Sequence, residues 1–229
     1  MPVFIFSDIL FICYFLSIIN VILKVVIILK IIYDSINNYS KVEYDHFFSL
    51  IKSEKQKKIN KLANSKDKKR SILGEMLFIK ILEEFKIDYY SIEIYKNEYG
   101  KPLIKDLNIY FNISHSKDYV VCVASKNQIG VDIEYIRKIN NNVVYQFATT
   151  NEVAYINNNN KNFSQKCFEI FTLKEAYFKC IGTNLNGIKN IEFSIKKNSI
   201  QFNNKDFNFK LVYSIDNYVI AICEKINYR

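Results

Sequence analysis

The sequence contains two short stretches that decide the fold and the site: GVDIE at residues 130–134 and FTLKEAYFK at residues 171–179. In a β-strand, alternate side chains share a face, so Asp132 and Glu134 should project from one face while their apolar neighbours bury the other. In the second stretch the apolar residues follow a helical period, and Glu175 and Lys179 lie four residues apart on one helix face. Three converging carboxylates and a lysine would suit a hard cation that holds a phosphorylated substrate.

The hydrophobic pattern around these stretches predicts alternating helices and strands. An N-terminal half is expected to open with a strand near Ile31, and Ser65 is expected to cap a long helix that reaches about Phe85. His115 is expected in a loop at a sheet edge, and Gly182 is expected to close the second long helix. The other expected helices cover residues 45–62, 143–156 and 162–181, and the other expected strands cover residues 107–113, 119–124, 128–133, 191–195, 208–214 and 218–224.

Together with three upstream matches, the two stretches resemble the motifs of the Sfp-type 4'-phosphopantetheinyl transferases. The family pattern is an Asp-x-Glu strand followed, roughly forty residues later, by an aromatic-x-x-Lys-Glu-Ala-x-x-Lys helix. YGKP at residues 99–102, FNISHS at 111–116 and KRSILGEML at 69–77 resemble further family motifs, in the expected order. The resemblance runs from about Lys30 to the C-terminus. Five motifs in order favour family membership far more than any one of them alone.

The resemblance implies an α+β fold made of two similar halves related by a pseudo-twofold, with the cofactor in the cleft between them. The halves are expected at residues 30–127 and 128–229, behind an apolar extension at residues 1–29. The implied activity is Mg²⁺-dependent transfer of the phosphopantetheine arm of coenzyme A to a serine of a carrier protein, with release of 3',5'-ADP. A monomer is expected, and nucleic acid is not an expected partner.

The resemblance also assigns roles to individual residues. Asp132, Glu134 and Glu175 are expected to bind Mg²⁺, and Lys174 and Lys179 to contact the pyrophosphate and the leaving group. Glu175 or Glu152 is expected to accept the serine proton, and the choice between them stays open. The expected contacts to coenzyme A are Lys55, Lys58, Arg70, Lys101, Ser114 and His115.

Composition limits the other classes of function. The net charge of +9 predicts an acidic partner, and a carrier protein, a nucleic acid or an anionic membrane would all qualify. A basic nucleic-acid or membrane-surface binder would leave the three carboxylates without a role, since they would repel such ligands. The other alternative is a non-catalytic module that binds coenzyme A or a carrier protein. The intact Asp-x-Glu and Lys-Glu-x-x-x-Lys motifs argue against it. Five cysteines without a C-x-x-C pair favour reduced thiols in the cytoplasm.

The apolar N-terminus permits two interpretations. Residues 9–23 carry no charge, and the apolar character resumes after Lys24. The uncharged run is shorter than the ~20 residues that span a bilayer comfortably, yet a membrane anchor with a cytoplasmic catalytic body remains one interpretation. An extension that is dispensable for the catalytic fold is the other.

Overall fold

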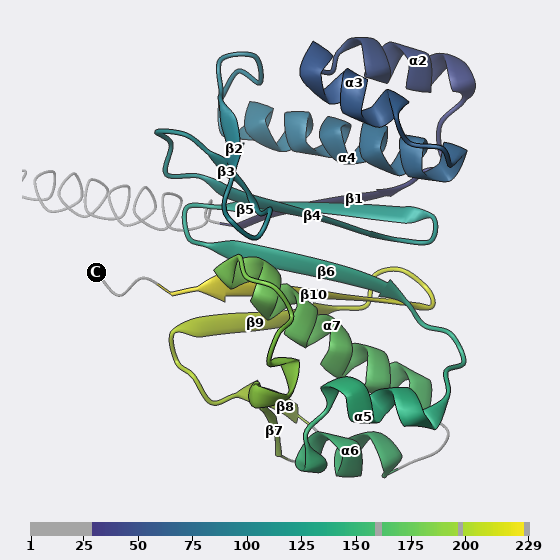
Figure 1. The fold of residues 1–229 in the computed structure, drawn as a ribbon, viewed down its shortest axis with the longest axis vertical. Helices are drawn as coiled ribbons and strands as arrows, with labels where there is room; N and C mark the ends of the chain where they lie inside the picture. The colour runs from purple at the N-terminus through teal and green to yellow at the C-terminus, as the bar shows by residue number, and fades with distance from the viewer. Residues whose placement is uncertain (1–28, 159–161, 197–198, 227–229) are drawn as a thin grey trace, which may run out of the picture.

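The computed structural model describes residues 29–158, 162–196 and 199–226, and two three-stranded antiparallel sheets lie at its centre (Figure 1). The first sheet has the order β1-β5-β4, with β1 at Leu29–Ser35, β4 at Tyr110–Ser116 and β5 at Tyr119–Ser125. The second has the order β6-β10-β9, with β6 at Ile129–Tyr135, β9 at Phe207–Val212 and β10 at Tyr218–Lys225. Helices cover the outer faces of both sheets, which confirms the predicted α+β class.

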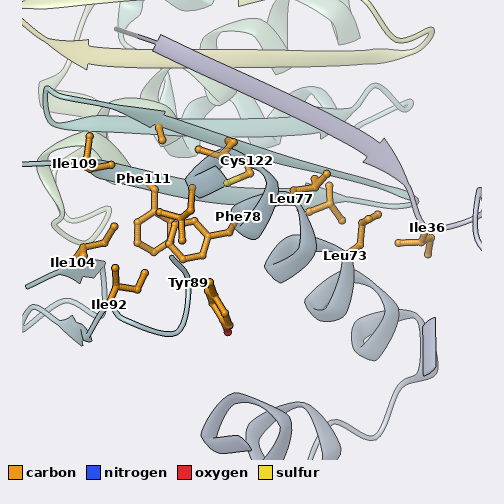
Figure 2. Packing of buried hydrophobic residues seen from close by; sticks show 14 residues of the cluster. Ile36, Leu73, Leu77, Phe78, Tyr89, Ile92, Ile104, Ile109, Phe111 and Cys122 are labelled. Atoms are coloured by element: carbon orange, nitrogen blue, oxygen red, sulfur yellow. The ribbon is translucent and has the colours of Figure 1, made fainter. Parts of the chain in front are cut away.

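The first sheet packs against α4, Ser65–Glu84, and the shorter helices α2, Lys41–Ser49, and α3, Ser53–Asn60, lie beyond it. Leu73, Leu77 and Phe78 of α4 meet the alternate residues of β5, among them Cys122, in one buried cluster (Figure 2). Phe78 stacks on Phe111 of β4 with ring centroids 4.0 Å apart. The short hairpin of β2, Ile94–Lys96, and β3, Pro102–Ile104, lies at the edge of this half.

The second sheet packs against α7, Phe163–Ile181, which ends at Gly182 in the left-handed conformation, as predicted. The helix comes very close to β6 at Gly130. A Cβ there would lie 2.2 Å from Ala176 O and from Cys180 N, so only glycine permits this approach. The remaining elements of this half are η1 at Asn141–Val143, α5 at Val144–Phe147, α6 at Thr150–Asn157, η3 at Ile188–Asn190, β7 at Phe193–Lys196 and β8 at Ser199–Phe202.

The two sheets bury a shared apolar cluster between them. Val121 and Val123 of β5, Val131 and Ile133 of β6, and Ile220 of β10 all belong to this cluster. Because side chains alternate along a strand, the opposite face of β6 carries Gly130, Asp132 and Glu134 toward α7. The prediction that both carboxylates share the face opposite the buried valine and isoleucine is therefore confirmed.

Several predicted elements differ from the structure. The helix expected at residues 45–62 is two helices, and its separation falls at Leu50, the C-cap of α2. The helix expected at 143–156 is also divided, because Thr149 is extended and begins α6 with a capping box to Glu152. The N-cap of α4 is Asn64, one residue before the predicted Ser65. His115 lies within β4, where it pairs with Val120, and not in a loop.

The predictions for the apolar N-terminus fall on residues 1–29, which lie almost wholly outside the described residues. Within the described ranges, no helix combines the length and the hydropathy that crossing a membrane requires.

Candidate active site

Asp132 is the centre of the candidate site, on the face of β6 that looks toward α7. Its Oδ1 accepts hydrogen bonds from Ser114 Oγ at 2.8 Å and from Lys179 Nζ at 2.6 Å. Its Oδ2 is buried, and no group in the described part of the chain donates a hydrogen bond to it. Because an unpartnered buried carboxylate oxygen is costly, this atom offers a ligand position for a cation.

Glu134 lies two residues further along β6, on the same face. Its Oε2 accepts a hydrogen bond from Ser116 Oγ at 2.9 Å, and Arg137 Nη1 lies 3.6 Å from the same oxygen. Burial and then the negative charge of Asp132 raise the pKa of Glu134. The carboxylate is thus held in place, and its ionised form is made more costly by its neighbour.

Alternate residues of β4 support β6 from the side. Asn112 Oδ1 accepts from Val131 N at 2.9 Å, and Ser116 Oγ accepts from Tyr135 N at 3.1 Å, while Ser114 donates to Asp132. Asn112 and Ser116 were not among the predicted site residues. Their signal was the polar side chain at every second position of an otherwise apolar strand, which marks a face that meets polar groups.

Helix α7 brings Glu175 to the same site. Burial, and then the negative charges of Asp132 and Glu134, raise the pKa of Glu175 from 4.5 to about 7, although the positive charge of Lys179 opposes them. The negative charges of Asp132 and Glu134 therefore disfavour the ionised form of Glu175. Lys179, one turn further along α7, reaches Asp132 and also donates to Ser114 Oγ at 3.0 Å.

The donor chemistry of this cluster fits Mg²⁺. Three carboxylates supply oxygen ligands of the kind that Mg²⁺ prefers, and Asp132 Oδ2 is a buried oxygen that lacks a donor. As they stand in the structure, however, no three His, Cys, Asp or Glu side chains within residues 29–158, 162–196 and 199–226 are grouped so that they could hold a metal ion. The ammonium of Lys179 at Asp132 is the cation that the structure itself provides there.

A pocket of about 810 Å³ lies in the N-terminal half. It is large enough for a nucleotide, since small-molecule sites typically measure about 300–1,000 Å³. Its walls combine an apolar part, with Phe78 and Phe111, and a set of cationic or polar side chains that includes Lys52, Lys55, Lys58, Arg70, Asn112 and His115. Because Asn112 and His115 come from β4, which also supplies Ser114, the pocket and the carboxylate site share a strand.

The cations that line the pocket differ in how far they are already paired with groups of the protein. Lys55 Nζ lies 3.1 Å from Glu75 Oε2, a carboxylate that also accepts from Tyr89 Oη at 2.7 Å. Lys58 pairs with Glu54 at 2.5 Å on the surface of α3. Arg70 donates to Lys117 O at 2.7 Å and pairs with Asp67, while its Nε is buried without a partner among the described residues. The guanidinium therefore has a donor left for an anion.

His115 lines the pocket and belongs to β4, the strand that also supplies Ser114 to the carboxylate site. Desolvation by the surrounding groups, and then the positive charges of Arg70 and Lys179, lower its pKa, even though part of the residue remains exposed. Both cations therefore disfavour the protonated imidazole.

Lys101 does not line this pocket. Its Nζ donates to Ile129 O at 3.0 Å and to Cys180 O at 2.6 Å, and burial lowers its pKa. The contact differs from the predicted one to coenzyme A, because the ammonium is already bonded to β6 and to the last turn of α7. Asn97 reinforces this contact with a hydrogen bond from Nδ2 to Gly182 O at 2.7 Å.

Glu152 and Lys174 also differ from the predicted arrangement. Their side chains are fully buried and form an ion pair with Nζ and Oε2 2.6 Å apart. The remaining polar atoms of the pair bond to backbone groups of Phe147, Thr149, Ile188 and Phe193. A base or a pyrophosphate ligand needs access to substrate, and this pair has none. Of the two carboxylates predicted as the base, only Glu175 lies in the site.

Comparisons with known proteins give matches to both halves of the chain. Residues 38–127 match the family profile described as 4'-phosphopantetheinyl transferase, N-terminal, and residues 128–223 match that of the 4'-phosphopantetheinyl transferase superfamily. The chain is 37% identical over 167 residues to the 4'-phosphopantetheinyl transferase gsp of Aneurinibacillus migulanus, which covers 72% of this chain and 70% of that relative.

Two further relatives carry related names. The 4'-phosphopantetheinyl transferase Sfp of Bacillus subtilis is 31% identical over 149 residues, 64% of this chain and 66% of that protein. The L-aminoadipate-semialdehyde dehydrogenase-phosphopantetheinyl transferase of Rattus norvegicus is 29% identical over 163 residues, 63% of this chain and 53% of that protein. Because both halves match family profiles and the relative from Aneurinibacillus migulanus is 37% identical over 70% of its own length, the chain belongs to the Sfp-type 4'-phosphopantetheinyl transferases.

Proposed function

We propose that this chain transfers the 4'-phosphopantetheine arm of coenzyme A to a serine of a carrier protein in a Mg²⁺-dependent reaction that releases 3',5'-ADP. Family membership supports the transfer itself. The observation that carries the proposed site is the buried Asp132 carboxylate, with one oxygen bonded to Lys179 and the other without a partner among the described residues. That arrangement prepares one carboxylate for two cations.

Asp132, Glu134 and Glu175 would hold the metal. When bound there, Mg²⁺ would neutralise the charge of the three carboxylates and of the pyrophosphate, as it does in other phosphoryl transfers. Ser114 and Ser116 orient the two carboxylates of β6 through hydrogen bonds at 2.8 and 2.9 Å. The pKa values of Glu134 and Glu175 are raised by burial first and then by the repulsion between carboxylates, which the cation would relieve.

The pocket would bind the nucleotide part of coenzyme A. Lys55, Lys58 and Arg70 would bind the 3'-phosphate, and His115, which lines the same pocket, would contact the pyrophosphate. The stacked rings of Phe78 and Phe111 form the apolar wall nearby. The net charge of +9 would favour an acidic carrier protein as the second substrate.

The reaction exchanges one phosphorus–oxygen bond for another. The serine oxygen of the carrier attacks the phosphorus that bears the pantetheine arm, and the bond from that phosphorus to the bridging oxygen breaks. Glu175 would accept the serine proton, since Glu152, the other candidate base, is buried in its ion pair with Lys174. Lys179 lies 2.6 Å from Asp132 and would stabilise the charge that develops on the departing 3',5'-ADP.

The direct test is the mass of a carrier protein after reaction. A purified apo carrier is incubated with the full chain, coenzyme A and Mg²⁺, and the intact mass is measured. The proposal expects a gain of one phosphopantetheine arm on the serine and the appearance of 3',5'-ADP. Unchanged mass for acyl, peptidyl and polyketide carriers alike would contradict it.

A further inference from the structure

Lys174 is a charged residue whose whole side chain is buried, directly before Glu175 in α7. Its ammonium has three N–H donors and lies within hydrogen-bond distance of three acceptor oxygens. These are Glu152 Oε2 at 2.6 Å, Phe147 O at 2.8 Å and Ile188 O at 3.2 Å. The three acceptors come from α6, the end of α5 and η3. Every donor of the lysine is therefore used within the protein.

Glu152 completes the network from the other side. Its Oε2 also accepts from Thr149 N at 2.8 Å, and its Oε1 accepts from Phe193 N at 2.8 Å, at the start of β7. The carboxylate is fully buried. One ion pair thus joins α7 to α5, α6, η3 and β7, and leaves neither group free to touch a substrate.

Such a pair is not needed for stability alone. Removing two charges from water is expensive, and an apolar pair of similar volume is often as stable or more stable. Burial accordingly lowers the pKa of Lys174, which Glu152 opposes. Hydrogen bonds are directional, whereas apolar contacts are not. A hydrogen-bonded ion pair can therefore fix the rotation of the helix that carries it.

The rotation of α7 matters to the site. Successive helical residues lie about 100° apart, as 3.6 residues make one turn. When Lys174 is fixed toward α6, Glu175 is turned toward β6. There burial, and then the charges of Asp132 and Glu134, raise its pKa. Lys179 follows one turn later and reaches Asp132.

We propose that the buried Lys174–Glu152 ion pair is a positioning device that sets the rotation of α7 and holds Glu175 opposite Asp132 and Glu134. The inference rests on the proposed function for the identity of the metal site, but its first readout is Mg²⁺ binding, which needs no turnover. Both residues are positioning residues in this account, and neither touches substrate.

The experiment compares Lys174→Met, the double variant Lys174→Met/Glu152→Leu, and wild type. Lys174→Met leaves a buried carboxylate unpaired, so its unfolding temperature should fall, and the double variant should recover most of that loss. The dissociation constant for Mg²⁺, measured by titration calorimetry, should nevertheless rise about tenfold in the double variant, as when other groups that orient metal ligands are removed. At saturating Mg²⁺ its kcat should stay within about tenfold of wild type, with KM for coenzyme A unchanged.

Lys166→Met is the matched control. Lys166 also lies on α7 and donates to a carbonyl of α6, Tyr155 O at 3.1 Å, but it has no carboxylate partner in the described structure. Its Mg²⁺ dissociation constant should equal that of wild type. If the double variant does not fold, Glu152→Gln, which keeps the shape and one acceptor oxygen, should show the same weakening of Mg²⁺ binding.

Three results would overturn the proposal. A loss of kcat by about a hundredfold or more at saturating Mg²⁺ would make Glu152 a catalytic base. A raised KM for coenzyme A with unchanged Mg²⁺ binding would make Lys174 a ligand of the pyrophosphate. If the stable double variant binds Mg²⁺ as tightly as wild type, the ion pair supports the fold without positioning the metal site. Absence of transfer by wild type that still binds Mg²⁺ would instead contradict the proposed function.

Discussion

Lys179 Nζ lies 2.6 Å from Asp132 Oδ1, while the second oxygen of the same carboxylate is buried without a donor in the described part of the chain. The lysine is on α7 and the aspartate is on β6, so this ion pair connects the helix to the strand at the centre of the site. One carboxylate can thereby serve a lysine and a metal at once. The pair should therefore affect both the affinity for Mg²⁺ and kcat.

Replacement of Lys179 by methionine should separate metal binding from catalysis. Without the ammonium at Asp132, Mg²⁺ should bind at least as tightly as in wild type, because a competing positive charge is gone. The kcat should fall about a hundredfold, since the charge on the leaving group loses a stabilising cation. Titration calorimetry and steady-state kinetics measure the two effects. An unchanged kcat would remove Lys179 from the reaction.

The response to Mg²⁺ should depend on pH through Glu175. Its pKa is raised from 4.5 to about 7 in the fold, so its protonated form stabilises the metal-free protein below pH 4.5, and this contribution is lost as the pH rises through about 7. At pH 8 the carboxylate is ionised and ready to bind the metal, whereas at pH 6 the metal must displace a proton. The increase in unfolding temperature on addition of Mg²⁺ should therefore be larger at pH 8 than at pH 6.

The control for this pH dependence is Glu175→Gln, which cannot titrate. Its unfolding temperature should respond to Mg²⁺ more weakly than that of wild type, and with a smaller difference between the two pH values. A wild-type response of equal size at pH 6 and pH 8 would contradict the assignment of Glu175 as a metal ligand.

Arg70 should distinguish coenzyme A from its 3'-dephospho form. The buried Nε of Arg70 has no partner among the described residues, and Arg70 lines the nucleotide-sized pocket. A charge-assisted hydrogen bond contributes roughly 1.5–3 kcal/mol, so Arg70→Met should raise KM for coenzyme A about tenfold or more. The KM for 3'-dephospho-coenzyme A should change little. Lys69→Met is the matched control, because Lys69 lies over the ring of Tyr44, 5.0 Å from its centroid. Equal losses for both substrates would remove Arg70 from the 3'-phosphate site.

Lys101 should affect stability and not cofactor affinity. Its ammonium donates to Ile129 O and to Cys180 O. Cys180 lies in the last turn of α7, where the helix dipole also stabilises a positive charge. Lys101→Met should lower the free energy of unfolding by about 2 kcal/mol, measured by urea denaturation, with KM for coenzyme A within about twofold of wild type. A large rise in KM at unchanged stability would return Lys101 to the cofactor site.

The sequence was informative where a local pattern directly determines geometry. Alternation in GVDIE predicted the face of Asp132 and Glu134, and helical spacing predicted that Glu175 and Lys179 lie one turn apart. Gly182 was predicted to end α7 because a left-handed residue is needed there. The divided helices were missed because an extended Thr149 that caps α6 interrupts a pattern whose apolar residues still suit a helix.

Tertiary contacts decided what the sequence could not. Lys101 and Lys174 look like ordinary cations in a phosphate-binding protein, and only the fold shows that both ammonium groups bond to carbonyls inside it. Glu152 is likewise one of many carboxylates in the sequence, and its Oε1 accepts a hydrogen bond from Phe193 N, forty-one residues away. A motif therefore gave the residue types of the site, whereas the partner of each charge required the structure.

The most direct test of the account is the transfer rate of Asp132→Asn. Asparagine keeps the shape of the side chain but removes the charge that Lys179 and Mg²⁺ would share. With an apo carrier protein, coenzyme A and saturating Mg²⁺, the account predicts that kcat falls about a hundredfold or more, while circular dichroism shows an unchanged fold. A rate within about threefold of wild type would contradict the placement of the active site at Asp132.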